Sequence, residues 1–397
     1  MQLHHEQRRV WAEIDLEALE HNYRCIRKHL PDGVKLCCVI KANAYGHGAP
    51  AVAKLYEQLG AELLAVSNIE EAIQLRRAEV GAPVLILGYT PAPCVCELAE
   101  QDLTQCVYSL EYARLLSDCA VRAGVTLDVH LKLDTGMGRI GFCLGDDAQE
   151  NERTLAAIEQ VCRLPALRIR GAFTHFSVAD DGEAGEQYSR RQHELFLWAV
   201  RELESRGIRF AIRHCSNSAA LLDYPEFSLD AVRAGVVLYG LYPSEAVRSR
   251  LDLRPAMTLK SVVSHIKQVK AGDSISYGRT FVAPDQMRIA TIPIGYADGY
   301  RRAYAEHGAF LLIRGKRAPV VGRVCMDQLM VDISGVDGVC VGDEVIVFGS
   351  GGALTAHDLA LLDATVDYEV ICSVGVRVPR VYRRGSAIVH IQDQLLS

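Results

Sequence analysis

The sequence of 397 residues predicts an α/β fold, an N-terminal (β/α)8 TIM-type barrel followed by a C-terminal mostly β domain. Short apolar runs alternate with amphipathic segments as far as about Pro243, and this order implies right-handed parallel strand–helix units. From that point the pattern changes to short alternating strands separated by glycine turns. The chain is also too long for one ordinary core. We therefore predict a barrel over residues 1–243 and a second domain over residues 244–397.

The first predicted element is a helix that begins after Asp15. Asp15 is a favourable N-cap residue, and Pro31 stops the helix. Between them, apolar residues recur at spacings of three and four, which is the period of one helix face. These residues are Leu16, Leu19, Tyr23, Ile26 and Leu30.

Eight apolar or β-branched runs follow as candidate barrel strands. They lie near Leu36–Ile40, Leu63–Val66, Val84–Leu87, Cys106–Tyr108, Leu127–Leu133, Ile169–Phe176, Ala211–His214 and Val232–Leu238. Amphipathic segments separate most of them and predict outer helices, for example Ile69–Ala78, Leu110–Ala123, Glu152–Cys162 and Gln187–Arg206. Eight such units predict a closed barrel. An open doubly wound sheet is the alternative, but no G-x-G-x-x-G follows an early strand.

The second domain is predicted from alternating segments and turn signals. The candidate strands are Leu259–Val269, Met287–Ile292, Val320–Val324, Leu329–Ile333 and Glu344–Phe348. The turns between them are Ala271–Asp273, Val341–Asp343 and Gly349–Gly352.

Composition excludes several classes of protein. Hydrophobic residues make up 49% and charged residues 23%, and the net charge of −6 is spread along the chain, so we expect no nucleic-acid partner. The start, Met1 to Val10, is polar, and no apolar run approaches the ~20 residues that span a bilayer. We expect a cytoplasmic protein without a membrane partner. In such a compartment the thirteen cysteines are expected to be reduced thiols. Cys94 and Cys96 have no further ligands at metal-binding spacing, so no metal is expected.

The most informative segment is V-I-K-A-N-A-Y-G-H-G, Val39 to Gly48. It sets Lys41 at the end of a buried apolar strand. Burial disfavours the ammonium form, lowers the pKa and frees the amine to form a Schiff base with an aldehyde. Tyr45 adds a hydroxyl, and Gly46 and Gly48 let the backbone approach a ligand closely.

Further polar residues fall at the carboxyl ends of other predicted strands, where barrel enzymes hold their active sites. Each residue alone has a structural explanation: Arg139 as an ion-pair partner, His175 as a core histidine, Ser218 as a helix cap. Their joint placement favours a site. The candidates are Arg139 after the fifth strand, His175 at the sixth, Asn217 and Ser218 after the seventh, and Arg233 in the eighth, with Ser218, Gly235 and Val236 fitting a phosphate.

The chain resembles the alanine racemase family over nearly its whole length, from W-A-E-I-D-L at Trp11 to R-V-P-R at Arg377. The Lys41 segment carries the resemblance, together with S-Y-G-R-T-F, Ser276 to Phe281, and V-C-M-D-Q, Val324 to Gln328. It implies an isomerase that uses pyridoxal 5′-phosphate to interconvert L-alanine and D-alanine and supplies D-alanine for peptidoglycan. It also implies a head-to-tail homodimer with shared active sites.

The resemblance assigns roles residue by residue. Lys41 is the Schiff-base lysine and the base for the D-enantiomer, and Tyr277 of the partner subunit is the base for the L-enantiomer. Arg139 and the backbone amide of Met326 contact the substrate carboxylate. The residues implied to bind the cofactor are Lys41, Tyr45, Arg139, His175, Asn217, Ser218, Arg233, Gly235, Val236 and Tyr368, with Arg233 facing the pyridine nitrogen and His175 contacting both the ring and Tyr277.

The sequence leaves several alternatives open. Tyr368 stands where related serine racemases carry asparagine, so a small apolar substrate is favoured over serine or a broad range of amino acids. A barrel-type amino-acid decarboxylase would carry an acidic residue in place of Arg233. A non-catalytic barrel that binds the cofactor would lack the second domain. The sequence leaves open a carbamate on Lys132, which is known in the family, and a catabolic role in place of a biosynthetic one.

Overall fold

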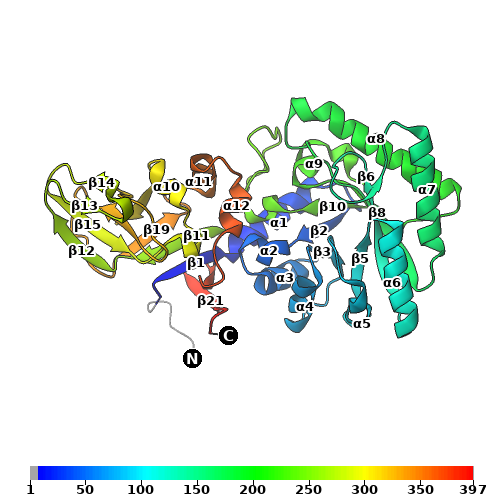
Figure 1. Ribbon diagram of the computed structural model, residues 1–397, viewed down its shortest axis with the longest axis horizontal. Helices are drawn as coiled ribbons and strands as arrows, with labels where there is room; N and C mark the ends of the chain where they lie inside the picture. Colours follow the sequence, from blue (N-terminus) through cyan, green and yellow to red (C-terminus); the bar gives the residue numbers. More distant parts are fainter. Residues whose placement is uncertain (1–7, 397) are drawn as a thin grey trace.

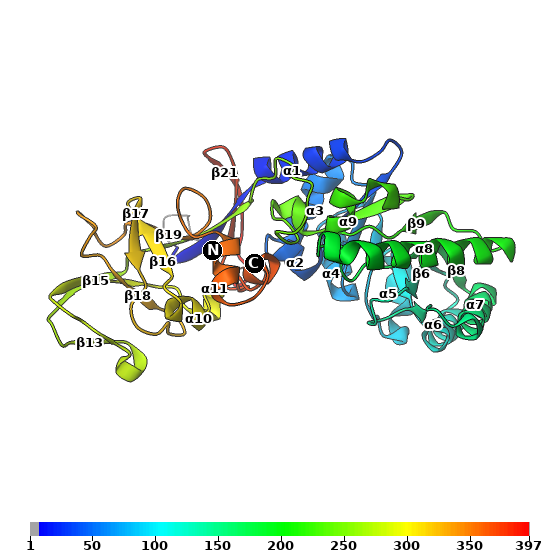
Figure 2. The ribbon, with the colours of Figure 1, turned by 90° about the horizontal axis from the view of Figure 1, so that it is seen from above.

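The computed structural model describes residues 8–396, so most of the polar start lies outside the described part. Figures 1 and 2 show a helix-covered barrel beside a β-rich part of the chain. The barrel strands pair in parallel in the order β5-β4-β3-β2-β10-β9-β8-β6, and pairing of β5 with β6 closes the ring. The predicted barrel is therefore confirmed. Its strands are β2 (Lys35–Val39), β3 (Leu63–Val66), β4 (Val84–Ile86), β5 (Leu103–Val107), β6 (Leu127–Asp134), β8 (Leu167–Phe173), β9 (Ile212–His214) and β10 (Ala231–Ala234), and the short β7 (Phe142–Cys143) pairs in parallel with the end of β6.

Helices cover the outside of the barrel and begin at polar caps. A side-chain oxygen accepts a backbone N–H from the first turn at Asp15, Asn68, Ser109, Asp147 and Asn217. The cap at Asp147 makes its helix begin four residues before the predicted Glu152–Cys162. The helices are α1 (Leu16–His29), α3 (Ala49–Gln58), α4 (Ile69–Arg77), α5 (Val95–Glu100), α6 (Leu110–Ala123), α7 (Ala148–Arg163), α8 (Glu183–Ser205) and α9 (Ser218–Asp223), with 3-10 turns η2 (Ala92–Cys94), η3 (Pro225–Phe227) and η4 (Val236–Tyr239).

The β-rich part is built on a seven-stranded sheet with the order β17-β16-β19-β11-β1-β20-β21. Its strand β1 (Val10–Asp15) precedes the barrel in the chain, yet pairs with β11 and β20. The other strands are β11 (Met257–Val262), β16 (Phe310–Ile313), β17 (Lys316–Pro319), β19 (Glu344–Phe348), β20 (Arg380–Arg384) and β21 (Ala387–Gln392). Two smaller sheets contain β12 (His265–Val269), β15 (Met287–Ile292) and β18 (Leu329–Asp332), and β13 (Ser274–Ile275) with β14 (Phe281–Val282).

Short helices complete the β-rich part: α10 (Arg302–Glu306), α11 (Ala356–Leu362), α12 (Asp367–Cys372), η5 (Tyr277–Arg279) and η6 (Tyr296–Asp298). Helix α12 packs against the barrel near α2 (Lys41–Tyr45), as both views show. No helix of residues 8–396 combines the length and the apolar character needed to cross a membrane.

Two strand predictions for this part are wrong. Leu259–Val269 is two strands, β11 and β12, because the chain leaves one sheet and enters another between them. Val320–Val324 is not a strand, because only Val320 forms an isolated bridge, to Val331. Both errors concern which residues pair in a sheet, which local alternation does not reveal.

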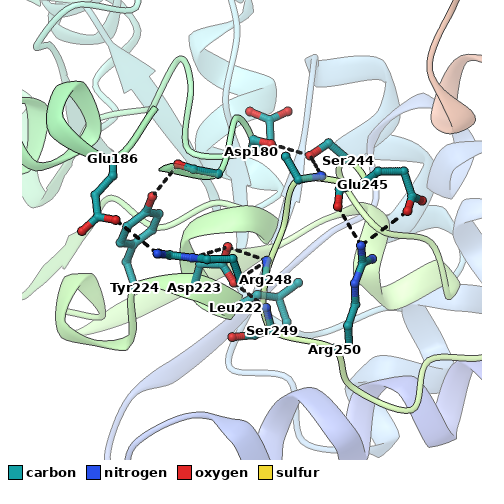
Figure 3. A network of polar contacts seen from close by, with 12 residues as sticks. Asp180, Glu186, Leu222, Asp223, Tyr224, Ser244, Glu245, Arg248, Ser249 and Arg250 are labelled. Carbon is teal, nitrogen blue, oxygen red and sulfur yellow. Dashed lines mark hydrogen bonds and ion pairs between the residues drawn. The ribbon is translucent and has the colours of Figure 1, made fainter. Parts of the chain in front are cut away.

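The segment that connects the barrel to β11 is tied to the barrel by polar contacts (Figure 3). The Ser244 hydroxyl donates to the carbonyl oxygen of Asp180, in the loop after β8. At the end of α9, the Asp223 carboxylate accepts the backbone N–H groups of Arg248 at 2.9 Å and of Ser249 at 2.7 Å. These bonds hold the connection against the face of the barrel on which the strands end.

Candidate active site

Lys41 stands at the start of an unusual turn. Strand β2 ends at Val39, and Lys41 begins α2, in which Ala42, Asn43, Ala44 and Tyr45 have φ values of 52°, 54°, 54° and 51°. Residues with a Cβ disfavour this left-handed conformation by roughly 1–2 kcal/mol each. The turn is therefore strained and persists only because neighbouring groups hold it.

Barrel groups hold the first half of the turn. The Glu71 carboxylate on α4 accepts the backbone N–H of Ala42 at 2.7 Å through one oxygen and that of Ser67 at 2.7 Å through the other. The side-chain oxygen of Asn43 accepts the backbone N–H of Ala49 at 2.9 Å. The backbone that follows Lys41 is thus fixed.

The β-rich part holds the second half of the turn. The Tyr382 hydroxyl on β20 donates to the carbonyl oxygen of His47 at 3.0 Å. A Cβ at Gly46 would lie 2.2 Å from the carbonyl oxygen of Ile371 on α12, and Gly46 has a φ of 82°. Only glycine satisfies both conditions, so this position seats α12 directly against the turn that begins at Lys41, here called the lysine turn.

The turn opens into a cavity of about 370 Å³ at the carboxyl ends of the barrel strands. A neighbouring cavity of about 270 Å³ shares several of its residues and extends toward α12. Together they bring all ten predicted cofactor residues to one place. These are Lys41, Tyr45, Arg139, His175, Asn217, Ser218, Arg233 and Gly235 in the first cavity, with Val236 and Tyr368 in the second.

Lys41 has the properties of a nucleophilic amine. Burial lowers its pKa, and the positive charge of Arg139 lowers it further. An amine with a lowered pKa keeps its lone pair over more of the neutral pH range. Lys41 can therefore form a Schiff base or accept a proton.

Arg139 is positioned by Asp134, the last residue of β6. One carboxylate oxygen of Asp134 accepts the backbone N–H groups of Gly136, Met137 and Gly138 at 2.8–3.1 Å, and the other accepts that of Arg139 at 3.1 Å. Burial alone would raise the pKa of Asp134, but these bonds outweigh it and lower the pKa. The glycine-rich segment after the fifth barrel strand therefore wraps a carboxylate of its own chain.

Arg233 organises the centre of the barrel. It is buried, and its guanidinium donates to Nδ1 of His175 at 3.1 Å and Nδ1 of His214 at 2.9 Å. It also donates to the carbonyl oxygens of Thr174 at 2.8 Å and Cys215 at 2.9 Å. An arginine cannot accept a hydrogen bond, so both imidazoles accept at Nδ1. His175 consequently carries its proton on Nε2.

The histidines stay neutral in this environment. Burial lowers the pKa of His175 well below its ordinary value, and the nearby charge of Arg233 lowers it further. The pKa of His214 is lowered for the same two reasons. The Nε2 of His214 donates to Nδ1 of His130 at 3.0 Å. A chain of neutral, oriented imidazoles thus supports Arg233.

Sequence reasoning missed His130 and His214. Both line the barrel interior together with Lys132, whose amine is buried beside the site. Burial, followed by the charge of Arg233, lowers the pKa of Lys132 to about 7. The available signal was the alternation in D-V-H-L-K-L-D, Asp128 to Asp134, where every second residue of an apolar strand is polar.

Donor groups converge where the chain turns from β9 and β10 into short helices. Ser218 begins α9 and Val236 begins η4, and the Ser218 oxygen accepts the backbone N–H of Gly235 at 2.9 Å. A Cβ at Gly235 would lie 2.8 Å from the Tyr45 hydroxyl oxygen. Burial raises the pKa of Tyr45, so its hydroxyl stays protonated and can donate. Asn217 caps α9 by accepting the backbone N–H of Ala220. The two helix starts and the nearby hydroxyl groups together suit an anion.

Tyr277 and Met326 do not join this cavity within one chain. Tyr277 begins η5, in the hairpin of β13 and β14, which lies at the end of the β-rich part far from the barrel in both views. Their side chains are 70% and 54% exposed.

Comparisons with known proteins agree with this geometry. The family described as "Alanine racemase, N-terminal domain" matches residues 14–243, and "Alanine racemase, C-terminal domain" matches residues 256–382. The chain is 47% identical to alanine racemase of Desulforamulus reducens over 374 residues, 94% of this chain and 98% of the relative. It is 43% identical to alanine racemase of Clostridium tetani over 389 residues, 97% of this chain and 98% of the relative.

Solved structures give the same result. Alanine racemase of Clostridium difficile in complex with cycloserine superposes with a TM-score of 0.89 at 41% identity, covering 97% of this chain and 98% of that one. Alanine racemase of Bacillus anthracis with bound L-Ala-P has a TM-score of 0.91 at 36% identity, covering 100% of both chains.

Proposed function

Since the chain belongs to the alanine racemase family, we propose that it interconverts L-alanine and D-alanine and that pyridoxal 5′-phosphate is its cofactor. The observation that carries this proposal is Lys41, a partly buried amine with a lowered pKa, in one cavity with an anion-binding cluster and with Arg233. The cofactor, once bound, supplies an electron sink that acidifies the α-proton of an amino acid.

The residues of the cavity fit this cofactor. Phosphate oxygens would lie among Tyr45, Ser218, Gly235 and Val236, where the absence of a Cβ at Gly235 lets the Tyr45 hydroxyl approach and the Ser218 oxygen accepts the Gly235 N–H. Tyr368 on α12 borders the same end of the cavity. Lys41 would hold the aldehyde carbon. Arg139 would bind the carboxylate of the substrate, on the side of Lys41 away from the phosphate.

Arg233 favours racemisation over other reactions of this cofactor. The guanidinium remains charged and has only donor atoms, so a neutral pyridine nitrogen is its suitable partner. A decarboxylase would need an acidic residue there, to keep a proton on that nitrogen. The bonds from Arg233 to His175 and His214 hold the guanidinium in place.

Two bases on opposite faces of the α-carbon would complete the reaction. Lys41 would exchange the proton of the D-enantiomer, and Tyr277 of the partner subunit that of the L-enantiomer. His175 carries its proton on Nε2 and could donate it to the phenol oxygen of Tyr277 of the partner subunit, which would lower the pKa of that phenol. The backbone amide of the partner's Met326 would meet the substrate carboxylate.

A two-fold homodimer would supply these partner residues. The exposure of Tyr277 and Met326, and the position of the hairpin that holds Tyr277 at the end of the β-rich part far from the barrel, support this arrangement. A symmetric dimer would form two identical composite sites.

Alanine is the proposed substrate because Tyr368 favours a small apolar side chain. A pocket of this kind rejects an added hydroxyl by only about 1–3 kcal/mol, so serine would turn over slowly. A cytoplasmic role in supplying D-alanine for peptidoglycan is part of this proposal.

The test is the conversion of L-alanine by the purified chain in deuterated water with added cofactor. We expect D-alanine that carries deuterium at the α-carbon, and trapping of the cofactor on Lys41 by borohydride. The Lys41→Ala variant should lose both, whereas Lys132→Ala should retain the trapping. Cofactor trapped on a lysine other than Lys41 would refute the assignment.

A further inference from the structure

A second cavity, of about 190 Å³, lies at the seam between the barrel and the β-rich part. The barrel contributes His47 and Tyr239, the connection contributes Ala256, Met257 begins β11, and Phe348 lies at the end of β19. Among the described residues no Asp, Glu, Lys or Arg lines it. It is separate from the site proposed above, which none of these five residues lines.

His47 is a polar residue in the lining of this apolar cavity, and one of its ring nitrogens needs a hydrogen-bond donor. Its Nδ1 lies 3.1 Å from the carbonyl oxygen of Ala44 and 3.0 Å from that of Tyr45. Carbonyl oxygens only accept, so Nδ1 carries the proton and Nε2 carries the lone pair. Burial lowers the pKa of His47 to about 4, which keeps the ring neutral.

The acceptor on Nε2 is left without a partner. Within residues 8–396, Nε2 of His47 is buried and receives no hydrogen bond. The hydroxyl of Tyr239, whose ring packs on the imidazole at 4.7 Å between centroids, donates instead to the carbonyl oxygen of Val39. A buried acceptor without a donor is costly, and native structures rarely leave one unsatisfied.

We propose that this cavity binds a small neutral amphiphile, an aromatic or aliphatic alcohol of about one ring, whose hydroxyl donates to Nε2 of His47. Size supports this class, since an apolar cavity of roughly 150 Å³ is known to hold benzene. The lining supports it too, because a charged ligand would be desolvated there without a counter-charge.

Occupancy would act on the lysine turn through the imidazole. The Nδ1–H of His47 donates to carbonyl groups of Ala44 and Tyr45, two of the strained residues that follow Lys41. A hydrogen bond accepted at Nε2 polarises the ring and strengthens donation from Nδ1. Binding itself does not depend on the racemase activity, so the two proposals can fail separately.

Phenol is the probe, and toluene, which has nearly the same shape without a donor, is its control. Binding to the cofactor-loaded chain is measured by ligand-observed NMR and calorimetry. Ala256→Leu and Ala356→Leu fill the cavity from two different walls. His47→Asn keeps an N–H near the position of Nδ1 but removes the acceptor at Nε2. Circular dichroism selects the variants that fold.

We expect phenol to bind the wild-type chain and to bind at least tenfold more weakly to either filled variant. His47→Asn should weaken phenol binding roughly fivefold, the factor that corresponds to one net hydrogen bond, and leave toluene binding unchanged. Equal binding of phenol to the wild-type and filled chains would overturn the site. Equal loss of phenol and toluene in His47→Asn would overturn the role of Nε2, and a wild-type chain that binds no phenol would overturn both.

Discussion

Arg380 donates a hydrogen bond of 2.8 Å from Nε to the carbonyl oxygen of Gly46, so a strand of the β-rich part holds the end of the lysine turn. The same guanidinium donates to the carbonyl oxygens of Val374, Gly375 and Val378 at 2.5–2.7 Å. Burial lowers its pKa to about 10. Arg380 thus joins the turn to the segment that follows α12.

Arg380→Met should therefore destabilise the fold and disturb the site. It leaves four buried carbonyl oxygens without this donor, at about 1–3 kcal/mol for each one that water does not reach. We expect at least ~3 kcal/mol lower free energy of unfolding in urea, and a lower kcat with faster loss of cofactor. Arg384→Met removes only an exposed ion pair to Glu20 and should change stability by less than ~1 kcal/mol. If the two variants behaved alike, Arg380 would have no special role in holding the turn.

Arg233→Glu should change the course of the reaction. A carboxyl group there can keep a proton on the pyridine nitrogen, so racemisation should slow and the fraction of turnovers that end as pyruvate should rise. Arg233→Gln loses the same donors without providing an acid, so it should slow racemisation with no gain in pyruvate. Both products are measured in one assay from L-alanine. An unchanged pyruvate fraction in Arg233→Glu would remove this role from Arg233.

Shared active sites predict complementation between two inactive chains. Lys41→Ala and Tyr277→Ala chains are co-expressed with different tags. In a mixed dimer one site carries both lesions and the other carries neither. Random pairing makes about half of the dimers mixed, so roughly a quarter of wild-type activity should return. No recovery in dimers shown by both tags to be mixed would mean that Tyr277 acts within its own chain.

Lys132 should make stability depend on pH above neutrality. Its pKa is about 7 in the folded chain against 10.5 for an unperturbed lysine, so between these values the unfolded chain binds the extra proton and stability rises with pH. Lys132→Met cannot titrate and should lack this rise. Urea unfolding at several pH values compares the two chains; parallel curves would contradict the prediction.

The free amine of Lys132 should also take up carbon dioxide as a carbamate. Isotope-labelled bicarbonate and carbon NMR detect this group, with Lys132→Met as the blank. The carbamate would place a negative charge beside Arg139 and Arg233, which both act on the pKa of Lys132. The absence of a labelled signal above neutral pH would exclude the modification.

The sequence predicted the barrel well because its strands depend on local apolar runs. Leu63–Val66 in the barrel, and Met287–Ile292 and Glu344–Phe348 in the β-rich part, agree with the observed strands to the residue. A prediction failed at Val320–Val324, where local alternation suggests a strand but only Val320 forms a bridge, to Val331. Strand β1 was not predicted, because its partners β11 and β20 lie far along the chain, beyond the whole barrel.

The site was predictable in one respect, because the carboxyl ends of all the parallel strands lie on the same face of the barrel. That geometry brought Lys41 and Arg233 to one cavity. The groups that hold them were not predictable, because Glu71, His214 and Arg380 act through folded contacts that no local pattern encodes. The roles of Tyr277 and Met326 rest on the family resemblance and stay predictions.

The position of β1 between β11 and β20 has a consequence for the synthesis of the chain on the ribosome. Glu13 and Arg383, which form an ion pair at 3.0 Å, are 370 positions apart. At the usual synthesis rate of about 5–20 residues per second, β1 leaves the ribosome roughly 20–70 seconds before its partner β20 exists. Both edges of this apolar strand are open to other nascent chains until β11 is made, and the edge that pairs with β20 stays open until the end of the interval. We therefore expect molecular chaperones to engage this N-terminal strand, and newly made chains to become functional only after release.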